Sequence, residues 1–426
     1  METTAKSNRL HIALFGRTNV GKSSFLNFLF AQDVSITSEI AGTTTDVVEK
    51  PMELLPIGPV VFIDTAGLGD KTALSDKRLK KTQKVFERAD LILLVTGSGV
   101  WGEYENFVMT SAAYGNIPVI VVINKIDISY PSDDYLSEIK SKVKFILNVN
   151  SLDLTQRNKI LDLLKTGIKN LLSGNEFFEP CLISDLVAAG KFAVLVVPID
   201  LEAPKGRLIL PQVQTIRDLL DSDAICVVVK ERELLQVIDK LNEPPAIVVC
   251  DSQVVLKVAA DTPPNIPLTT FSILFSRLKA DIVTMARGAA FIDTLCPNSK
   301  ILIAEACSHH PIGDDIGRVK IPRWFRQYLG FSPKIDIFAG KDYPENIQDY
   351  SLIVHCGGCM FNRKQLLTRL QMANEVSLPI TNYGICISLL QGVLERTLSP
   401  FPQALAAYNQ EKQRIDNLGG FNGKIK

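Results

Sequence analysis

The chain has 426 residues, enough for roughly two to four domains that each bury a core. Its 46% hydrophobic and 22% charged residues are typical of folded proteins and argue against extensive disorder. The 46 basic and 46 acidic residues cancel, so the basic excess that usually marks a nucleic-acid-binding protein is missing.

Residues 1–6 lack the apolar core of a signal peptide. No stretch approaches the roughly 18 uninterrupted apolar residues of a membrane span. We therefore expect a cytoplasmic protein whose thiols stay reduced. Clustered cysteines are then more often metal ligands or redox groups than disulfides.

The first predicted strand, at 10–15, leads into a glycine-rich loop. Residues 16–23, GRTNVGKS, match the phosphate-loop pattern, and an apolar-faced helix follows at 24–29. The glycines let backbone N–H groups surround phosphates at a helix N-terminus. Lys22 is expected to reach the β and γ phosphates, and the Ser23 hydroxyl to ligate Mg²⁺.

Two more motifs follow predicted strands in the order typical of GTPases. After 60–63 comes Asp64, which can hold a magnesium-bound water, and then Gly67, whose N–H can touch the γ-phosphate. After 119–123 comes the run NKID, in which the Asp127 carboxylate can accept two hydrogen bonds from guanine. These motifs together predict an N-terminal P-loop GTPase domain over 1–173.

The loop at 42–46 resembles a first switch, whose threonine closes on Mg²⁺ in the triphosphate state. Thr44 is the preferred residue and Thr43 its rival. The fifth, guanine-contacting loop falls at 150–152, and its contact residue stays open. The predicted nucleotide-binding residues are Gly16, Asn19, Val20, Gly21, Lys22, Ser23, Ser24, Thr43, Thr44, Asp64, Gly67, Asn124, Lys125 and Asp127; of these, Asn19, Lys22, Thr44 and Gly67 are expected to act in catalysis.

Two details make this domain resemble the GTPases grouped with TrmE and Era. Leu68 stands where Ras-like enzymes have a glutamine that orients the attacking water. Asn19 occupies the position that helps to hold a potassium ion in that group. The resemblance implies slow, K⁺-stimulated GTP hydrolysis that suits a switch, with K⁺ replacing the charge of an arginine finger.

Alternating strands and helices predict a small parallel α/β domain over 174–275. Strands are expected at 192–197, 224–229 and 246–250, helices at 212–220, 231–241 and 253–259, and one more strand within 267–274. No catalytic motif is found here, so scaffolding or dimerisation is the expected role. Cys181, Cys226 and Cys250 are expected to be buried small apolar residues.

A third α/β domain is predicted over 276–426, beginning with a connecting helix at 277–295. Strands are expected at 300–306, 334–338 and 351–354, helices at 363–374 and near 385–395, and a helical tail from 402. Cys296 and Cys386 are expected to be packing residues.

Cysteines and histidines cluster after two of these strands, as Cys307-Ser308-His309-His310 and as His355-Cys356-Gly357-Gly358-Cys359. Open α/β sheets place their sites at such strand ends. The glycines permit a tight turn that aims both sulfurs of Cys356 and Cys359 at one point. The spacing leaves two alternatives about equally favoured, a Cys₃His zinc site and an iron–sulfur cluster held by three thiolates.

The chain as a whole resembles the HydF family, the maturation GTPases of FeFe-hydrogenases. The resemblance is strongest at 204–212 (PKGRLILPQ), 304–310 (AEACSHH) and 354–359 (VHCGGC). It implies a 4Fe–4S cluster bound by Cys307, Cys356 and Cys359, with His309 and His355 as candidate fourth ligands.

The resemblance further implies a homodimer formed through the middle domain. Such a scaffold receives a di-iron precursor of the H-cluster from two radical-SAM maturases and delivers it to apo FeFe-hydrogenase. The alternatives are an RNA- or ribosome-associated assembly GTPase, which the TrmE/Era likeness suggests, and a zinc-stabilised regulatory GTPase.

Overall fold

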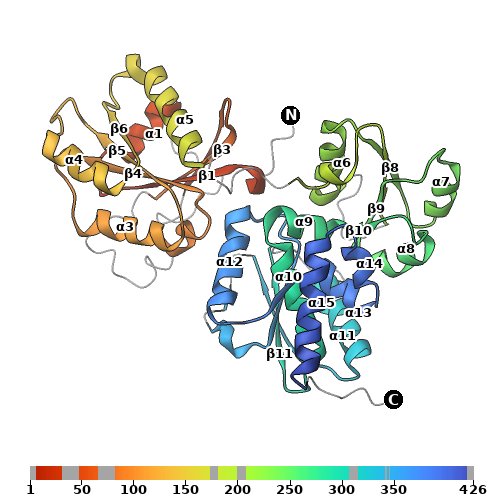
Figure 1. Ribbon diagram of the computed structural model, residues 1–426. Coiled ribbons are helices and arrows are strands. Elements are labelled where there is room, and N and C mark those ends of the chain that lie inside the picture. The colour runs from red at the N-terminus through yellow and green to blue at the C-terminus, as the bar shows by residue number, and fades with distance from the viewer. Residues whose placement is uncertain are drawn as a thin grey trace. The chain divides into compact units, whose positions relative to one another are not determined.

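The computed structural model describes residues 6–30, 48–65, 82–172, 181–198, 208–306, 315–340, 343–344 and 346–419. The chain divides into two compact units, residues 1–179 and 180–426 (Figure 1). Each unit is described by itself below.

The first unit contains a six-stranded sheet with the order β2-β3-β1-β4-β5-β6. All neighbouring strands are parallel except β2, which runs antiparallel to β3. The strands are β1 (Leu10–Phe15), β2 (Val48–Leu54), β3 (Gly58–Asp64), β4 (Leu91–Gly97), β5 (Val119–Asn124) and β6 (Phe145–Val149). The central strands are buried on both faces, which explains their near-continuous apolar sequences.

Helices cover both faces of this sheet (Figure 1). They are α1 (Lys22–Phe30), α3 (Glu103–Tyr114), α4 (Asp133–Lys142) and α5 (Arg157–Leu172). Alternate residues of β1 belong to two different hydrophobic cores, one on each face of the sheet. Ile12 and Leu14 pack towards α1 and α5. Ala13 and Phe15 pack towards α3 and α4. This doubly wound arrangement places the loops after β1, β3 and β5 at one edge, as the GTPase prediction requires.

The second unit contains two four-stranded sheets in which every pairing is parallel. The first sheet has the order β10-β9-β7-β8, with β7 (Phe192–Val196), β8 (Ile225–Val229), β9 (Ile247–Cys250) and β10 (Leu268–Thr270). Its helices are α6 (Leu210–Asp221), α7 (Leu234–Lys240) and α8 (Val255–Asp261).

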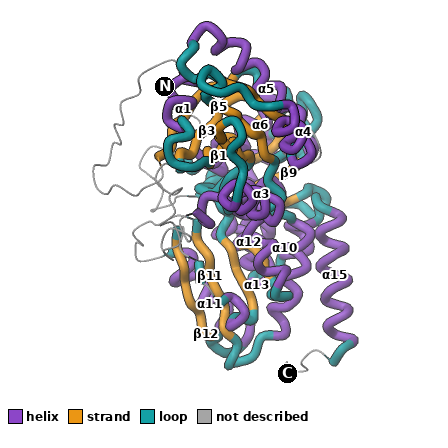
Figure 2. Tube along the Cα trace, turned by 90° about the vertical axis from the view of Figure 1, so that its left-hand side faces the viewer, coloured by secondary structure: helices purple, strands orange, loops and turns teal. Residues whose placement is uncertain are grey.

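The other sheet has the order β12-β11-β13-β14. Its strands are β11 (Lys300–Glu305), β12 (Lys334–Ala339), β13 (Leu352–His355) and β14 (Ile380–Asn382). Figure 2 shows β11 and β12 side by side. The strand order reverses between β11 and β13, because β12 lies on one side of β11 and β13 with β14 on the other. Such a switch point is where open α/β sheets bind ligands.

One continuous hydrophobic core joins the two sheets of the second unit. Its remaining helices are α9 (Phe271–Lys279), α10 (Ile282–Ala289), α11 (Ile321–Leu329), α12 (Arg363–Glu375), α13 (Tyr383–Leu390), α14 (Leu394–Leu398) and α15 (Pro402–Asn417). Helix α10 approaches β14 closely at Gly288, where a Cβ would lie 2.0 Å from the Ile380 carbonyl oxygen. Because one core joins both sheets, the predicted boundary at residue 275 between a middle and a C-terminal domain stays a prediction.

Three predicted elements differ from the structure. The single helix expected near 385–395 is two helices, because α13 ends at Leu390 and α14 begins at Leu394. The strand expected within 267–274 ends at Thr270, whose hydroxyl accepts a hydrogen bond from Ile273 N and caps α9. The single helix expected at 277–295 is broken at Ala280. Asp281 caps the next helix, α10, by accepting from the backbone N–H groups of Val283 and Thr284.

The cysteine predictions are confirmed only in part. Cys250 and Cys386 are buried, but Cys181 is exposed and Cys226 and Cys296 are half-buried. Cys226 lies on β8, an edge strand with neighbours on one side only. Among the described residues, no helix has the length and apolar character needed to cross a membrane.

Candidate functional site

The phosphate loop joins β1 to α1, and its backbone needs glycine at two positions. Gly16 has φ +155° and Gly21 has φ +92°. A Cβ at Gly16 would lie 2.3 Å from the Val95 carbonyl oxygen, and one at Gly21 would lie 2.3 Å from Asn124 Nδ2. The glycines therefore allow the loop to lie directly against β4 and β5.

Lys22, the first residue of α1, is buried and folds back over the loop. Its Nζ donates to the carbonyl oxygens of Gly16, at 2.6 Å, and Arg17, at 2.8 Å. Ser23 and Ser24 follow it in the first turn and are exposed. Lys22 and Ser23 thus lie in the first turn of α1, next to the glycine-rich loop, and their roles with phosphate and Mg²⁺ stay predictions.

The end of β5 holds the other end of the loop. Asn124 Nδ2 donates to the carbonyl oxygens of Val20, at 3.1 Å, and Gly21, at 3.3 Å. Lys125 Nζ donates to the Asn19 carbonyl oxygen at 2.7 Å. Asn19 itself is exposed with φ +63°, and Asp127 is exposed two residues beyond Lys125.

The fifth loop joins this network through Ser151, a residue that sequence reasoning left open. Its Oγ donates to Asn124 Oδ1 at 2.7 Å, and its backbone N donates to the same oxygen at 3.4 Å. The two ends of the Asn124 amide thus connect the phosphate loop with residues 150–152. Asp64, at the end of β3, is buried and lies opposite Leu14 in the β1 register. The predicted Thr43, Thr44 and Gly67 lie outside the described residues.

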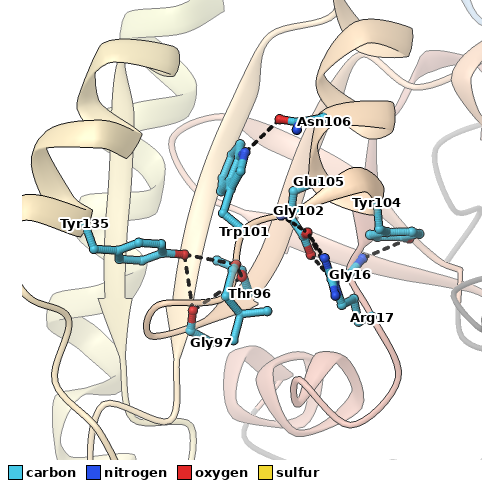
Figure 3. Close-up of polar contacts among 11 residues, drawn as sticks. Gly16, Arg17, Thr96, Gly97, Trp101, Gly102, Tyr104, Glu105, Asn106 and Tyr135 are labelled. Atoms are coloured by element: carbon cyan, nitrogen blue, oxygen red, sulfur yellow. Dashed lines mark hydrogen bonds and ion pairs between the residues drawn. The ribbon is translucent and has the colours of Figure 1, made fainter.

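Helix α3 adds contacts that no motif predicts (Figure 3). Arg17 pairs with the fully buried Glu105 through two nitrogens, at 2.6 to 3.2 Å. The Arg17 pKa is raised, first by the hydrogen bonds to Glu105. Tyr104 OH accepts a hydrogen bond from Gly16 N at 3.3 Å.

The cysteine turn lies at the switch point between β11 and β13. Cys356 follows β13, and its backbone N donates to the Ala304 carbonyl oxygen at 2.8 Å. Its Sγ accepts hydrogen bonds from Ala306 N, at 3.0 Å, and Gly358 N, at 3.4 Å. Two backbone N–H groups thus converge on this sulfur.

Only one of the two glycines in the turn has an unusual backbone conformation. Gly358 has φ +66°, and a Cβ there would lie 2.8 Å from Leu366 Cδ1. At Gly357 a Cβ would have its nearest contact at 3.6 Å, on Ser272 Oγ. Of the two glycines predicted to permit the turn, Gly358 is therefore the one whose backbone conformation favours glycine.

A buried lysine from α9 holds the same turn. Lys279 Nζ donates to the carbonyl oxygens of Phe361 at 2.8 Å, Cys359 at 3.3 Å and Gly358 at 3.5 Å. Burial raises the pKa of the Cys359 thiol, and the positive charge of Lys279 opposes that rise. Lys279 therefore fixes the backbone of the turn and places a cation beside a sulfur.

His355, a predicted candidate for the fourth ligand, is fully buried with both ring nitrogens engaged. Nε2 lies 2.9 Å from Arg369 Nη1, and Nδ1 lies 2.8 Å from the Cys356 carbonyl oxygen. Because a guanidinium can only donate, Nε2 accepts and Nδ1 carries the proton. Burial, with the charge of Arg369, lowers the His355 pKa to about 3. Metal coordination by His355 would require Arg369 to withdraw.

Arg369 is itself held in place by two aromatic rings. Its guanidinium carbon lies 4.4 Å from the ring centroid of Tyr343 and 4.5 Å from that of Phe361. Cys307 and His309 lie outside the described residues, which contain no group of three or more metal-binding side chains. Cys356 and Cys359 offer sulfur donors of the kind that zinc and iron–sulfur clusters use.

Three family models match consecutive parts of the chain. A 50S ribosome-binding GTPase model matches residues 11–125, a hydrogen maturase F dimerization domain matches 182–280, and a hydrogen maturase F tetramerization domain matches 283–400. The first unit is thus a GTPase domain, the class of protein that hydrolyses GTP with Mg²⁺. The other two matches indicate homo-oligomerisation.

Curated relatives resemble the first unit. The GTPase Der of Nitratiruptor sp. is 33% identical over 176 residues, covering 39% of this chain and 38% of that protein. The tRNA modification GTPase MnmE of Prochlorococcus marinus is 32% identical over 197 residues, covering 40% of this chain and 42% of that protein. The chain thus spans about two fifths of the length of these relatives.

Among solved structures, a variant of Aquifex aeolicus Era bound to GDP and AlF₄⁻ matches with 23% identity and a TM-score of 0.32, covering 55% of this chain and 98% of that one. The two hydrogen maturase F models together span just over half of the chain, and the GTPase model precedes them in order. The predicted resemblance to HydF is confirmed, and the chain belongs to the hydrogen maturase F family.

Proposed function

We propose that this protein is a GTP-hydrolysing scaffold that carries a 4Fe–4S cluster and delivers the di-iron precursor of the H-cluster to FeFe-hydrogenase. The cluster would be held by Cys307, Cys356 and Cys359. When bound, it would supply an iron through which the precursor is held and released. The protein's own residues would position the sulfurs and fix charge beside them.

The geometry of the cysteine turn carries this proposal. The Cys356 sulfur accepts hydrogen bonds from two backbone N–H groups, and Lys279 donates to three carbonyl oxygens of the turn. Both features lie at the ends of β11 and β13, where the strand order reverses and open α/β sheets bind ligands. These contacts fix the backbone of the turn and the place of the Cys356 sulfur.

The first unit would act as a slow switch for this scaffold. Mg²⁺ would be bound through Ser23 and Thr44, and K⁺ through Asn19, which is exposed in the loop with φ +63°. GTP turnover in K⁺ buffer should exceed turnover in Na⁺ buffer of equal ionic strength. Equal rates in the two buffers would remove potassium from the mechanism.

The second unit would provide the dimer through the residues predicted as a middle domain, 174–275, with the cluster in 276–426. Edge strand β8 exposes Ile225 and Val228, as an unprotected strand that pairs with a second copy would do. The proposed partners are two radical-SAM maturases and apo FeFe-hydrogenase, in the cytoplasm. The RNA- or ribosome-associated alternative receives no support, because the matches beyond residue 181 are to hydrogen maturase F domains.

The deciding experiment measures iron, sulfide and zinc in anaerobically purified protein. We expect about four irons and four sulfides per chain, the content of a 4Fe–4S cluster. Cys356→Ser and Cys359→Ser should lose the iron, whereas Cys181→Ser, a substitution of an exposed cysteine, should keep it. Colourless protein with one zinc per chain would instead establish the zinc-stabilised alternative.

A further inference from the structure

Arg17, in the glycine-rich loop, forms a two-point ion pair with the buried Glu105 of α3. Arg17 Nε lies 2.8 Å from Glu105 Oε1, and Arg17 Nη2 lies 2.6 Å from Oε2. The Glu105 side chain is 0% exposed, against 37% for Arg17. Glu105 Oε2 also accepts from Gly102 N at 2.9 Å, so the carboxylate is held from two sides.

The neighbouring residue of α3 holds the neighbouring residue of the loop. Tyr104 OH accepts from Gly16 N at 3.3 Å. Burial raises the Tyr104 pKa to about 12, which keeps the phenol neutral. Two consecutive residues in the first turn of α3 therefore contact two consecutive residues of the phosphate loop (Figure 3).

The start of α3 is itself fixed to the sheet. Thr96 Oγ1 donates to the Val100 carbonyl oxygen at 2.5 Å. Tyr135 OH, from α4, lies 3.2 Å from the Gly97 carbonyl oxygen and 3.1 Å from that of Val100. These bonds hold the connection from β4 to α3, so α3 offers a rigid support for Arg17 (Figure 3).

The far end of the loop is held separately, by Asn124 and Lys125. The loop is thus tied at both ends, and the N–H groups between them can be aligned before a phosphate arrives. Such prior alignment is what makes backbone N–H groups effective in binding phosphates.

We propose that Arg17 is a positioning residue of the GTP site, anchoring the phosphate loop to α3 through Glu105 instead of neutralising the transferred phosphate as an arginine finger does. Removing the guanidinium would leave the buried Glu105 carboxylate without a cationic partner and with the Gly102 N–H alone among the donors named above, a costly state for a buried charge. The inference rests on GTP binding by the first unit and concerns how the loop is held.

Gly102→Ala tests the anchor without changing either member of the ion pair. Gly102 has φ −163°, an extended conformation open to any residue, but its new Cβ would lie 2.7 Å from Arg17 Nη2. The methyl group should push the guanidinium off Glu105. We expect the affinity for a fluorescent GTP analogue to fall about tenfold, with kcat at saturating GTP nearly unchanged.

The matched control is Gly97→Ala in the same connection, where the new Cβ meets only Val100 Cγ2 at 3.5 Å, an ordinary contact. This variant should bind GTP like the wild type. Arg17→Ala should reproduce the affinity loss of Gly102→Ala, and the double variant should be no weaker than Arg17→Ala alone. The reason is that the methyl group then has no guanidinium to displace. Thermal unfolding of each full-length variant establishes that it is folded.

Three outcomes would overturn the proposal. The first is a large loss of kcat in Arg17→Ala with unchanged affinity, which indicates a catalytic arginine. The second is an affinity loss from Gly102→Ala that persists when Arg17 is absent, which indicates a general disturbance of α3. The third is a wild-type protein that binds no GTP, which would overturn the nucleotide site itself.

Discussion

The phosphate loop of the first unit and the cysteine turn of the second are built alike. Each follows a parallel strand, and in each a buried lysine donates to carbonyl oxygens of the loop itself. Lys22 contacts two such oxygens and Lys279 contacts three. Backbone N–H groups are also used in both places: Gly16 N donates to Tyr104 OH, and the Cys356 sulfur accepts from Ala306 N and Gly358 N.

The two sites differ in the sequence separation between the lysine and the carbonyl groups that it contacts. Lys22 reaches carbonyl groups six and five residues before it. Lys279 reaches carbonyl groups 79 to 82 residues after it. A local arrangement leaves a recognisable motif, whereas a long-range one exists only after the sheet and α9 have packed together.

The largest expected effect is on GTP affinity, when the lysine of the phosphate loop alone is replaced. Lys22→Ala should weaken GTP binding about a hundredfold or more, because a charged contact to the phosphates is lost. The iron content of the same protein should stay at the wild-type level. Calorimetric GTP titration and iron analysis of one preparation measure both, and a shared loss would show that the two sites depend on each other.

The reciprocal change is Lys279→Met, which keeps the length of the side chain but removes its charge and its donors. We expect iron content after anaerobic reconstitution to fall to less than about half, because three carbonyl groups lose a buried partner and the sulfurs lose a nearby cation. GTP hydrolysis should be unaffected. Lys279→Arg, which retains the charge, should recover part of the iron, and full loading of Lys279→Met would contradict the role of Lys279.

A smaller effect compares the two glycines of the cysteine turn. Gly358→Ala should destabilise the turn by about 1–2 kcal/mol, because alanine is strained at φ +66° and its methyl group meets Leu366. Gly357→Ala should change little, since its new contact lies at 3.6 Å. The rate of cluster loss to an iron chelator measures both, and equal rates would contradict the distinction.

The smallest effect concerns Ser151. Ser151→Ala removes the hydroxyl that donates to Asn124 Oδ1, while the backbone N–H of residue 151 keeps its own bond. The loss of one such bond costs about 1 kcal/mol, or about a fivefold weaker affinity for GDP. The control is Ser141→Ala, an exposed serine of α4 whose hydroxyl donates to the Glu138 carbonyl oxygen. An unchanged affinity in Ser151→Ala would remove the fifth loop from the network.

Much of the first unit follows from local patterns. The phosphate-loop motif contains Gly16, Gly21 and Lys22, and the NKID motif contains Asn124. The structure brings these two motifs into contact. Glu105 could not be found this way, because a glutamate in the first turn of a helix is ordinary sequence. Its importance comes from its burial against a residue 88 positions away.

In the second unit, more of the site depends on long-range contacts that local sequence patterns do not reveal. The alternation of apolar runs predicted its parallel strands, and the spacing of Cys356 and Cys359 predicted the turn. Sequence reasoning missed Lys279 and Arg369, since each is a lone cation on a helix until α9 and α12 pack beside the turn. For His355, the residue type suggested a ligand, but burial against a guanidinium gives the ring another partner.

The bonds between β11 and β13 have a consequence for the order of events during biogenesis. The Cys356 backbone and sulfur are held by Ala304 and Ala306, fifty residues earlier in the chain, through contacts made entirely within the polypeptide. The shape of the turn therefore depends on the sheet, and the pairing of β11 with β13 must form before the Cys356 sulfur reaches its place. A substitution that slows or prevents the pairing of β11 with β13 should therefore also delay or displace the Cys356 turn.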